Sequence, residues 1–335
     1  MTLLAELAAG AIVTLAAGAL YTVGFVAWTR RAYTPDGRFV EVTGGRLHVI
    51  DIPGARADAP VVALLHGASG NARDMAMALA PSLRGRYRVL AFDRPGHGWS
   101  DRPGGRADAA PARQAALIRE ALGRLGVQRA IVVGHSWSGA LATRLALDCP
   151  ELVAGLVLVA PVTHPWPGGV SWYYGPAASA LTGRVFTGAI AAPVGSALLK
   201  PSVASVFHPD APPPDYAARG ATWLVLRPAE FRANAQDVAD LLGHVTAQFE
   251  RYDEIAAPTA IVHGEADTTV SPTLHSRAIA RQIAGSRLTL LAGAGHMPHH
   301  THAELVAAEI DAVAAAAFGA GVTAAPGLPA GSPRR

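Results

Sequence analysis

Short apolar runs rich in β-branched residues alternate with segments of helical spacing along most of this chain, and few folds satisfy that pattern. The apolar runs are flanked by Gly, Pro or polar residues and lie at Val61–Leu65, Val89–Phe92, Ala130–Val133, Leu156–Ala160, Thr259–Val262 and Leu288–Leu291. The helical segments lie at about residues 71–84, 108–125, 137–148, 273–283 and 302–317. Such alternation predicts an α/β fold, with a mostly parallel sheet covered by helices on both faces.

A β-hairpin opens the predicted core. Its strands, Arg38–Thr43 and Leu47–Ile52, meet at Gly44-Gly45, and they bring the expected sheet to eight strands. We expect the core to be built in two parts, from residues 38–162 and from residues 256–317.

The interval between these two parts, residues 163–255, breaks the alternation. It contains many Pro, Gly and aromatic residues and no clear strand, followed by a long helical pattern from Ala229 to Tyr252. An insertion of this length between consecutive strands is too large for a plain loop. We therefore predict a helical cap inserted at one edge of the sheet.

The first 31 residues form a predicted membrane anchor. No charged residue occurs from Leu7 to Thr29, and as a helix this stretch is about 35 Å long, against a hydrocarbon core of about 30 Å. Tyr21, Phe25 and Trp28 gather at its C-terminal end, where an aromatic belt would lie. The stretch is apolar on all faces, which argues against a helix buried in a soluble core. We therefore predict a transmembrane helix in residues 1–31.

A cleaved secretory signal is the alternative for this segment. Ala17-Gly18-Ala19 offers a small-residue cleavage site, and cleavage would leave the protein secreted or periplasmic. A signal requires a positively charged start, however, and Glu6 is the only early side-chain charge. Arg30 and Arg31 follow the stretch, which favours a main domain on the cytoplasmic side (of the inner membrane in a bacterium).

Composition excludes several classes of protein. The 28 basic and 25 acidic residues leave a net charge of only +3, which is too small an excess of positive charge to indicate a nucleic-acid-binding protein. Cys149 is the only cysteine, so neither an intramolecular disulfide nor a cysteine-based metal site can form. Lys200 is the only lysine, and no nucleotide-binding glycine motif surrounds it, so we expect no cofactor. Residues 318–335, rich in Gly, Pro and Ala, are predicted to form a disordered tail.

The strongest chemical signal is a serine placed between a strand and a helix. The sequence IVVGHSWSG at 131–139 ends a buried strand, makes a Gly-x-Ser turn at Ser136, and opens a helix. A serine on such a turn is exposed above the sheet, beside backbone amides at a helix N-terminus. Gly-x-Ser also occurs at Ser69 and Ser171, so the tripeptide alone is a weak signal. The strand–turn–helix context singles out Ser136.

A base and an acid follow two later strands. Asp267 comes after Thr259–Val262, and His296 comes after Leu288–Leu291. Because parallel strands end at the same edge, we expect Ser136, Asp267 and His296 to converge, in the chain order of a nucleophilic triad. Glu265 competes for the acidic role, but it lies closer to the strand end.

Three further histidines, His299, His300 and His302, compete with His296 for the role of base. Gly293 and Gly295 precede His296 and permit the sharp turn that aims its ring. A metal patch at 299–302 is the alternative reading of the cluster. We expect no metal there, because no matching acidic or cysteine ligand accompanies these histidines in the sequence.

A glycine-rich turn supplies the remaining part of the site. The sequence HGASG at 66–70 follows the strand Val61–Leu65 and precedes a helix. The backbone amides of Ala68 and Trp137 are predicted to form an oxyanion hole for a tetrahedral intermediate. A phosphate-binding loop is the alternative, and the missing lysine and serine or threonine disfavour it.

Together these motifs resemble the α/β-hydrolase superfamily, and specifically its capped, esterase-like serine hydrolases. The resemblance spans about residues 38–317 and rests on HGASG at 66–70, DRPGHGWSDRP at 93–103, GHSWSG at 134–139, HGEADTTVSP at 263–272 and GAGHMPHH at 293–300. It implies Ser136 as nucleophile, His296 as base and Asp267 as the acid that orients it. It implies a structural turn at 93–103, so neither Asp93 nor His97 is assigned a catalytic role.

One residue departs from the family pattern. Ser138 occupies the position of the last glycine in Gly-x-Ser-x-Gly, which leaves the geometry of the turn in question. Ser136 itself argues against haloalkane dehalogenases and epoxide hydrolases, which resemble this architecture but place Asp at the turn.

The predicted reaction is hydrolysis of a lipophilic small-molecule ester through an acyl-enzyme. Trp166, Trp172 and Tyr173 of the cap are candidate residues for an apolar substrate pocket, and their alternative role is to pack the cap onto the sheet. Hydrolysis of C–C, amide or lactone bonds, perhydrolysis and acyl transfer remain alternatives that use the same triad. A ligand-binding protein that retains the fold is the alternative outside enzymology.

Overall fold

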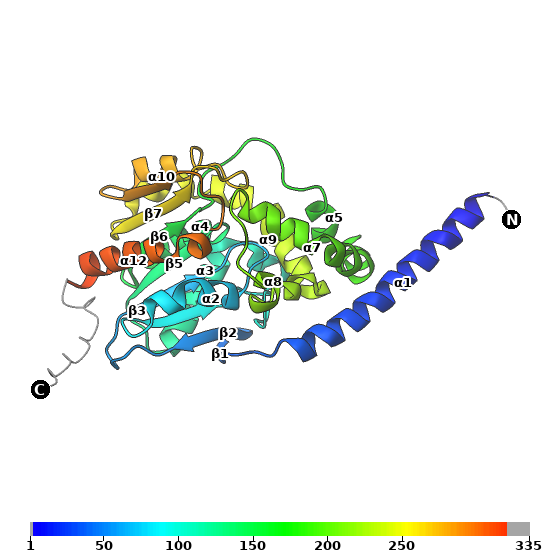
Figure 1. The fold of residues 1–335 in the computed structure, drawn as a ribbon, viewed down its shortest axis with the longest axis horizontal. Coiled ribbons are helices and arrows are strands. Elements are labelled where there is room, and N and C mark those ends of the chain that lie inside the picture. The colour runs from blue at the N-terminus through cyan, green and yellow to red at the C-terminus, as the bar shows by residue number, and fades with distance from the viewer. Residues whose placement is uncertain (1–2, 320–335) are drawn as a thin grey trace, which may run out of the picture.

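The computed structural model describes residues 3–319, and one sheet of eight strands forms the centre of the domain (Figure 1). The strand order is β1-β2-β4-β3-β5-β6-β7-β8; β1 and β2 form the expected hairpin, β2 pairs antiparallel with β4, and the later pairs are parallel. The prediction of a mostly parallel eight-stranded sheet is confirmed. The strands are β1 (Arg38–Val42), β2 (Gly45–Ile52), β3 (Val61–Leu65), β4 (Arg88–Phe92), β5 (Ala130–His135), β6 (Val153–Val159), β7 (Thr259–Gly264) and β8 (Arg287–Leu291).

The central strands are apolar on both faces because each one separates two layers of helices. In β3, Val62 and Leu64 belong to one core, whereas Val61, Ala63 and Leu65 belong to the other. This is why the sequence shows continuous apolar runs there rather than alternation. The first core is covered by α2 (Ala72–Leu83) and α12 (Ala303–Phe318), and the second by α3 (Pro111–Arg124), α4 (Ser138–Asp148) and α10 (Ser276–Gln282).

The insertion between β6 and β7 is helical, as predicted, and no strand forms within it. Its elements are α5 (Tyr174–Ala178), α6 (Gly183–Val185), η2 (Phe186–Ile190), α7 (Ala191–Phe207), α8 (Tyr216–Arg219), η3 (Thr222–Leu226), α9 (Pro228–Thr246) and η4 (Phe249–Glu254). The expected single helical pattern from Ala229 to Tyr252 is wrong in one respect, because α9 ends at Thr246 and a separate short turn follows. Helix α7 was not predicted, because its internal Pro201 and its small residues obscure the helical periodicity of its apolar residues.

The N-terminal segment is one long helix, α1 (Leu3–Ala32), that projects away from the domain (Figure 1). By length and composition, α1 is long and apolar enough to cross a membrane. The cap segment Gly183–Phe207 meets the same criteria. The C-terminal half of α1 lies against η2 and α7, where Phe25 is buried with Ala192 and Leu226. Of the predicted tail, Phe318 ends α12, and residues from 320 onward lie outside the described part of the chain.

Candidate active site

Ser136 lies on a tight turn between β5 and α4. Its φ of 51° falls in the left-handed region, so the backbone reverses within one residue of the strand end. The turn requires small neighbours. A Cβ on Gly134 would collide with the carbonyl oxygen of Ser138, and a Cβ on Gly139 would lie 2.5 Å from that of Pro161. The Gly-x-Ser sequence therefore reflects a close approach of strand and helix at this point.

Three side chains from three strand ends form one chain of hydrogen bonds. His296 Nε2 lies 2.9 Å from Ser136 Oγ, and His296 Nδ1 lies 2.6 Å from Asp267 Oδ2. Each of the three residues is buried, with exposed fractions of 4–8%. The structure thus brings together the serine, histidine and aspartate that the sequence singled out.

Asp267 is held as an acceptor for the imidazole. Its Oδ1 accepts hydrogen bonds from the amides of Thr269 (2.7 Å) and Val270 (2.9 Å), which fixes the carboxylate. Burial alone would raise the pKa of Asp267, but hydrogen bonds from His263 and His296 outweigh it and hold the pKa well below its usual range. An ionised carboxylate in this position keeps the proton on Nδ1 of His296 and leaves Nε2 free to face the serine.

The competing candidates lie elsewhere. The carboxylate of Glu265 is about half exposed and pairs with Arg277 at 3.3 Å. His299 and His300 lie on α11 (Pro298–Thr301), and the ring of His302 contacts the hydroxyl of Thr301 at 2.9 Å. The geometry therefore selects Asp267 and His296 among the acidic and histidine candidates.

Two buried histidines that the sequence analysis did not single out support this chain of hydrogen bonds. His263 is the penultimate residue of β7, and its Nε2 lies 2.9 Å from Asp267 Oδ2 while its Nδ1 lies 2.6 Å from Ser276 Oγ. His135, beside the nucleophile, contacts the carbonyl of His296 through Nε2 at 3.1 Å. Burial lowers the pKa of His135 well below its usual range, so it acts as a neutral donor. Their positions at the ends of β7 and β5 were the available signal.

The loop after β3 passes directly beside the serine. A Cβ on Gly67 would lie 2.9 Å from the Cβ of Ser136, so only glycine permits this approach. Ala68 follows Gly67, and neither its amide nor that of Trp137 donates a hydrogen bond to another group within residues 3–319. Ser138, at the departure from the family pattern, is fully buried and donates its hydroxyl to the carbonyl of His66 at 2.5 Å. The extra hydroxyl thus ties the start of α4 to the glycine-rich loop.

A buried arginine, also unassigned by the sequence analysis, lies behind this loop. Arg94 lies two residues beyond the end of β4 and is fully buried. Its guanidinium donates to the carbonyl of His66 (3.1 Å), pairs with Asp237 (2.6 Å), and lies 4.0 Å from the ring centre of Trp137. Burial lowers the pKa of Arg94, and the adjacent Asp237 carboxylate opposes that shift. The sequence 93–103 is therefore a structural turn that also places the Arg94 guanidinium against the carbonyl of His66 and the ring of Trp137.

Helix α9 of the cap covers the site. The Trp137 indole donates to the carbonyl of Asp237 (2.9 Å), and the amide of Ser69 donates to the side chain of Asn234 (2.7 Å). Both contacts join α9 to the two turns that carry the predicted oxyanion donors. The cap is therefore fixed to the catalytic face of the sheet by polar contacts as well as by packing.

The three aromatic residues predicted to line the pocket have different surroundings. Trp166 packs partly buried against the core below α4, with its ring 6.1 Å from that of His275. Tyr173 stacks on Tyr174, with ring centres 4.4 Å apart. Trp172 is 78% exposed and contacts Tyr173 and Phe186 at the outside of the cap. The ring of Trp172 thus lies on the surface of the described structure.

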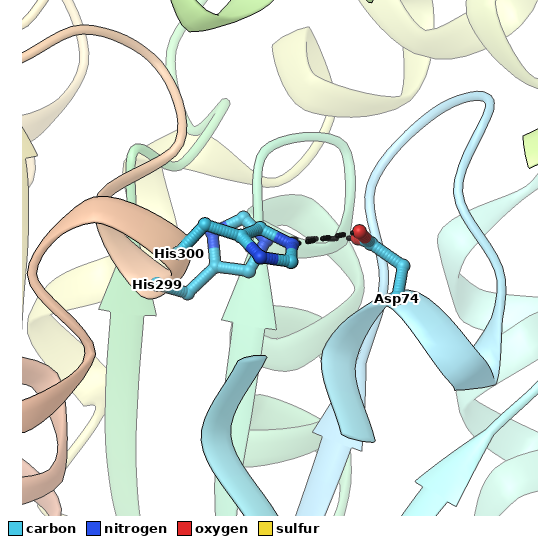
Figure 2. Close-up of side chains that lie close together, drawn as sticks. All are labelled: Asp74, His299 and His300. Carbon is cyan, nitrogen blue, oxygen red and sulfur yellow. Dashed lines mark hydrogen bonds and ion pairs between the residues drawn. The ribbon is translucent and has the colours of Figure 1, made fainter. Parts of the chain in front are cut away.

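Asp74, His299 and His300 form the cluster best suited to hold a metal ion (Figure 2). Their ligand atoms lie within 4.8 Å of one another, and Asp74 accepts hydrogen bonds from His300 (2.8 Å) and the Tyr216 hydroxyl (2.7 Å). Burial would raise the pKa of Asp74, but His300 and His299 hold it well below its usual range. From the sequence we expect no metal here, because no matching acidic ligand lies near these histidines. That reason is wrong, because Asp74 on α2 is an acidic residue in the cluster. In the structure the cluster joins α2 to α11.

Known proteins share this architecture. A family model described as the alpha/beta hydrolase fold matches residues 60–303. The chain belongs to this family. Two of the curated relatives of this α/β-hydrolase are similar over most of both chains. It is 30% identical to an uncharacterized protein of Mycobacterium tuberculosis over 72% of this chain and 71% of that one. It is 29% identical to a 2-hydroxy-6-oxononadienedioate/2-hydroxy-6-oxononatrienedioate hydrolase of Klebsiella pneumoniae, over 80% of this chain and 91% of that one.

A solved structure with the same fold covers most of this α/β-hydrolase. The crystal structure of a bacterial membrane phospholipase A superposes with a TM-score of 0.65 at 22% identity, over 93% of this chain and 97% of that one. At that identity the likeness concerns the fold. The family match is what supports assignment of the chain as a hydrolase.

Proposed function

We propose that this α/β-hydrolase is a serine hydrolase that cleaves carboxylic esters of lipophilic small molecules. The observation that carries the proposal is the buried hydrogen-bonded chain from Ser136 through His296 to Asp267. A serine hydroxyl becomes a nucleophile only with a base within hydrogen-bond reach, and 2.9 Å is within that reach.

In the proposed reaction, Ser136 Oγ attacks the ester carbonyl while His296 takes its proton at Nε2. The negative charge that develops on the carbonyl oxygen is stabilised by the amides of Ala68 and Trp137, which are free of internal hydrogen bonds within residues 3–319. His296 then protonates the departing alcohol and next takes a proton from the water that attacks the acyl-enzyme. It finally returns that proton to Ser136 Oγ as the carboxylic acid leaves. Asp267 stabilises the imidazolium in both steps.

A second candidate is hydrolysis of a C–C bond next to a carbonyl, by the same three residues. The observation that favours it is the Klebsiella relative, which acts on 2-hydroxy-6-oxo acids and is similar over 80% of this chain. Its substrates are dianionic, whereas those proposed for this chain are lipophilic. A substrate panel that contains both classes distinguishes the two candidates.

We also propose that α1 anchors the enzyme in the membrane, with the catalytic domain on the cytoplasmic side. The packing of α1 supports a retained helix over a cleaved signal, because Phe25 is buried against the cap and its ring lies 6.3 Å from that of Trp223. Removal of α1 would expose this contact. Arg30 and Arg31 in the last turn support the cytoplasmic orientation. The fold shared with a membrane phospholipase A makes lipid esters a natural first class to test.

The test is steady-state turnover by the full chain in detergent micelles. The panel contains p-nitrophenyl esters of graded acyl length, lysophospholipid and diacyl phospholipid, a lactone, an amide and a 2-hydroxy-6-oxodienoate. We expect the highest kcat/KM on an ester of medium or long chain and none in Ser136→Ala. Ser171→Ala, which changes the serine of another Gly-x-Ser sequence at an exposed position of the cap, is the matched control and should retain turnover. Preferred turnover of the dienoate would favour the second candidate, and no Ser136-dependent turnover of any substrate would contradict both.

A further inference from the structure

The contact between α1 and the cap runs along half of the helix. The buried residues of α1 are Thr22, Phe25 and Thr29, which lie on one face at helical spacing. Gly18 begins the contact, since a Cβ there would collide with the carbonyl oxygen of Ala189 in η2. From Gly18 onward, α1 therefore lies at the same level as the cap.

The length of α1 sets where this contact lies relative to a bilayer. The part of α1 before the contact, residues 3–17, is about 22 Å long, whereas the hydrocarbon core of a bilayer is about 30 Å thick. A tilted helix would need to be longer still. If the described helix α1 provides the whole span, several residues beyond Gly18 must also lie in hydrocarbon. The part of the cap that touches them, at Ala189, then lies at membrane depth as well.

The cap surface at this level has the composition that lipid requires. Residues 185–199, which form the end of α6, η2 and the first half of α7, contain no charged residue, and Arg184 and Lys200 flank them. Val185, Val194 and Leu198 are each about half exposed (50–53%). In water such a cluster of exposed aliphatic side chains beside a second apolar helix is unfavourable. The flanking cations have side chains long enough to reach the headgroups.

A groove between α1 and α7 adds a place for an acyl chain. Its volume is about 830 Å³, and it is lined by Leu20, Tyr21, Phe25, Trp28, Ala197 and Trp223. Most of the lining is apolar or aromatic and Ser196 adds one hydroxyl, so its chemistry matches a hydrocarbon chain better than a polar ligand.

We propose that the cap is embedded in the bilayer beside α1, with η2 and the first half of α7 in the acyl-chain layer and a lipid chain in the groove. The proposal rests on the proposed anchoring by α1 and is independent of the bond that the enzyme cleaves. It means that α9, which covers the catalytic serine, belongs to a cap in direct contact with lipid. Lipophilic substrate then reaches the cap from the membrane rather than from water.

The single cysteine makes the proposal directly testable. Cys149→Ser removes the only native thiol, and single cysteines are then placed at Val194, Leu198 or Ala197 and labelled with a nitroxide. The labelled full chain is reconstituted in phosphatidylcholine–phosphatidylglycerol nanodiscs. Accessibility is measured by power-saturation electron paramagnetic resonance with oxygen, which concentrates in lipid, and with a nickel chelate, which stays in water. Val13→Cys on the free part of α1 and Asp58→Cys on an exposed loop of the core are the lipid and water references.

We expect the three cap labels to show an oxygen-to-nickel ratio close to that of Val13 and severalfold above that of Asp58. A high oxygen-to-nickel ratio at Val13 with low ratios at the cap labels would overturn the embedding of the cap and leave the anchoring by α1 intact. A water reading at Val13 too would mean that the anchoring itself fails, and the embedding with it. The third outcome is that the cap labels are shielded from both reagents and show spin–spin broadening that vanishes on dilution with unlabelled chain. This result would assign the labelled face of the cap to a contact with a second copy of the chain and overturn the lipid contact.

Discussion

The buried ion pair between core and cap gives the most specific stability prediction. Asp237 on α9 accepts hydrogen bonds from Arg94 (2.6 Å), Arg102 (2.8 Å) and Gln114 (3.0 Å), and neither Arg94 nor Asp237 is exposed. Asp237→Asn removes the negative charge and turns one accepting atom into a donor, so Arg94 is left in the interior without a counter-charge. Breaking a buried pair in this way costs about 3–5 kcal/mol.

We expect this loss as a decrease of about 10 °C in Tm, because 1 kcal/mol shifts Tm by about 2–4 °C in a domain of this size class. The assay is thermal unfolding of the full chain in detergent, followed by tryptophan fluorescence. Asp240→Asn is the matched control. It lies on the same helix and binds Arg106 at 2.8 Å, but Arg106 is half exposed, so its loss should cost at most about 1 kcal/mol.

A double variant separates the charge from the packing. Arg94→Met with Asp237→Leu removes the two fully buried charges and should recover part of the lost Tm, since apolar side chains often replace a buried pair at little cost. Recovery should be incomplete, because Arg102 and Gln114 still lose their hydrogen bonds to Asp237. It should still turn over ester slowly, because the Arg94 hydrogen bond to the carbonyl of His66 is gone. Equally small shifts in Tm for Asp237→Asn and Asp240→Asn would refute the reasoning that this pair fastens the cap to the loop beside the serine.

Three further outcomes follow from the site and the core. Asp267→Asn should lower kcat by about 10⁴-fold through the wrong imidazole tautomer, as the same change does in a serine protease, while Glu265→Gln stays near native in the same ester assay. Ser138→Ala should lower the free energy of unfolding by about 1 kcal/mol in urea titration, through loss of its bond to the carbonyl of His66; an unchanged midpoint would show that the bond contributes nothing. The free energy of unfolding should fall as pH drops below about 6.5, the pKa of an unfolded histidine, because burial lowers the pKa of some histidines in the folded state and unfolding then takes up protons. Each such histidine should lower the free energy of unfolding by roughly 2 kcal/mol at pH 5. A urea midpoint that does not change from pH 7 to pH 5 would contradict this. The folded values are about 3 for His66 and about 4 for His275 and His299.

Much of the core could be predicted because its strands carry strong local signals. The six apolar runs and the Gly44-Gly45 hairpin fall on the eight strands of the sheet, with ends displaced by up to three residues. The cap was harder to predict. Its six helices and turns other than α7 and α9 are only three to six residues long, and α7 contains Pro193, Gly195 and Pro201. The positions of these elements therefore depend on packing rather than on periodicity, as in the contacts of α7 with α1 and α9.

The residues of the candidate site also differ in how far the sequence predicts them. Ser136, Asp267 and His296 each follow a strand, and a parallel sheet must bring its strand ends to one edge, so their convergence is predictable from order alone. The contacts between Arg94 and Asp237, and between Asp74 and His300, join residues more than 140 positions apart. No local pattern encodes such pairs, because they depend on how the cap and α11 are placed on the finished sheet. The exposure of Trp172 was equally beyond sequence reasoning, since an aromatic residue fits a pocket wall and a lipid-facing surface alike.

The measurement that tests the central claim most directly is labelling of Ser136 by a fluorophosphonate probe. The full chain in detergent is treated beside Ser136→Ala, and both are examined by intact mass spectrometry after a thermal unfolding check. We predict one probe adduct on the native chain and none on Ser136→Ala, because only a serine paired with His296 is activated for attack. A folded native chain that acquires no adduct, or an adduct that persists in Ser136→Ala, would contradict the assignment of Ser136 as the nucleophile.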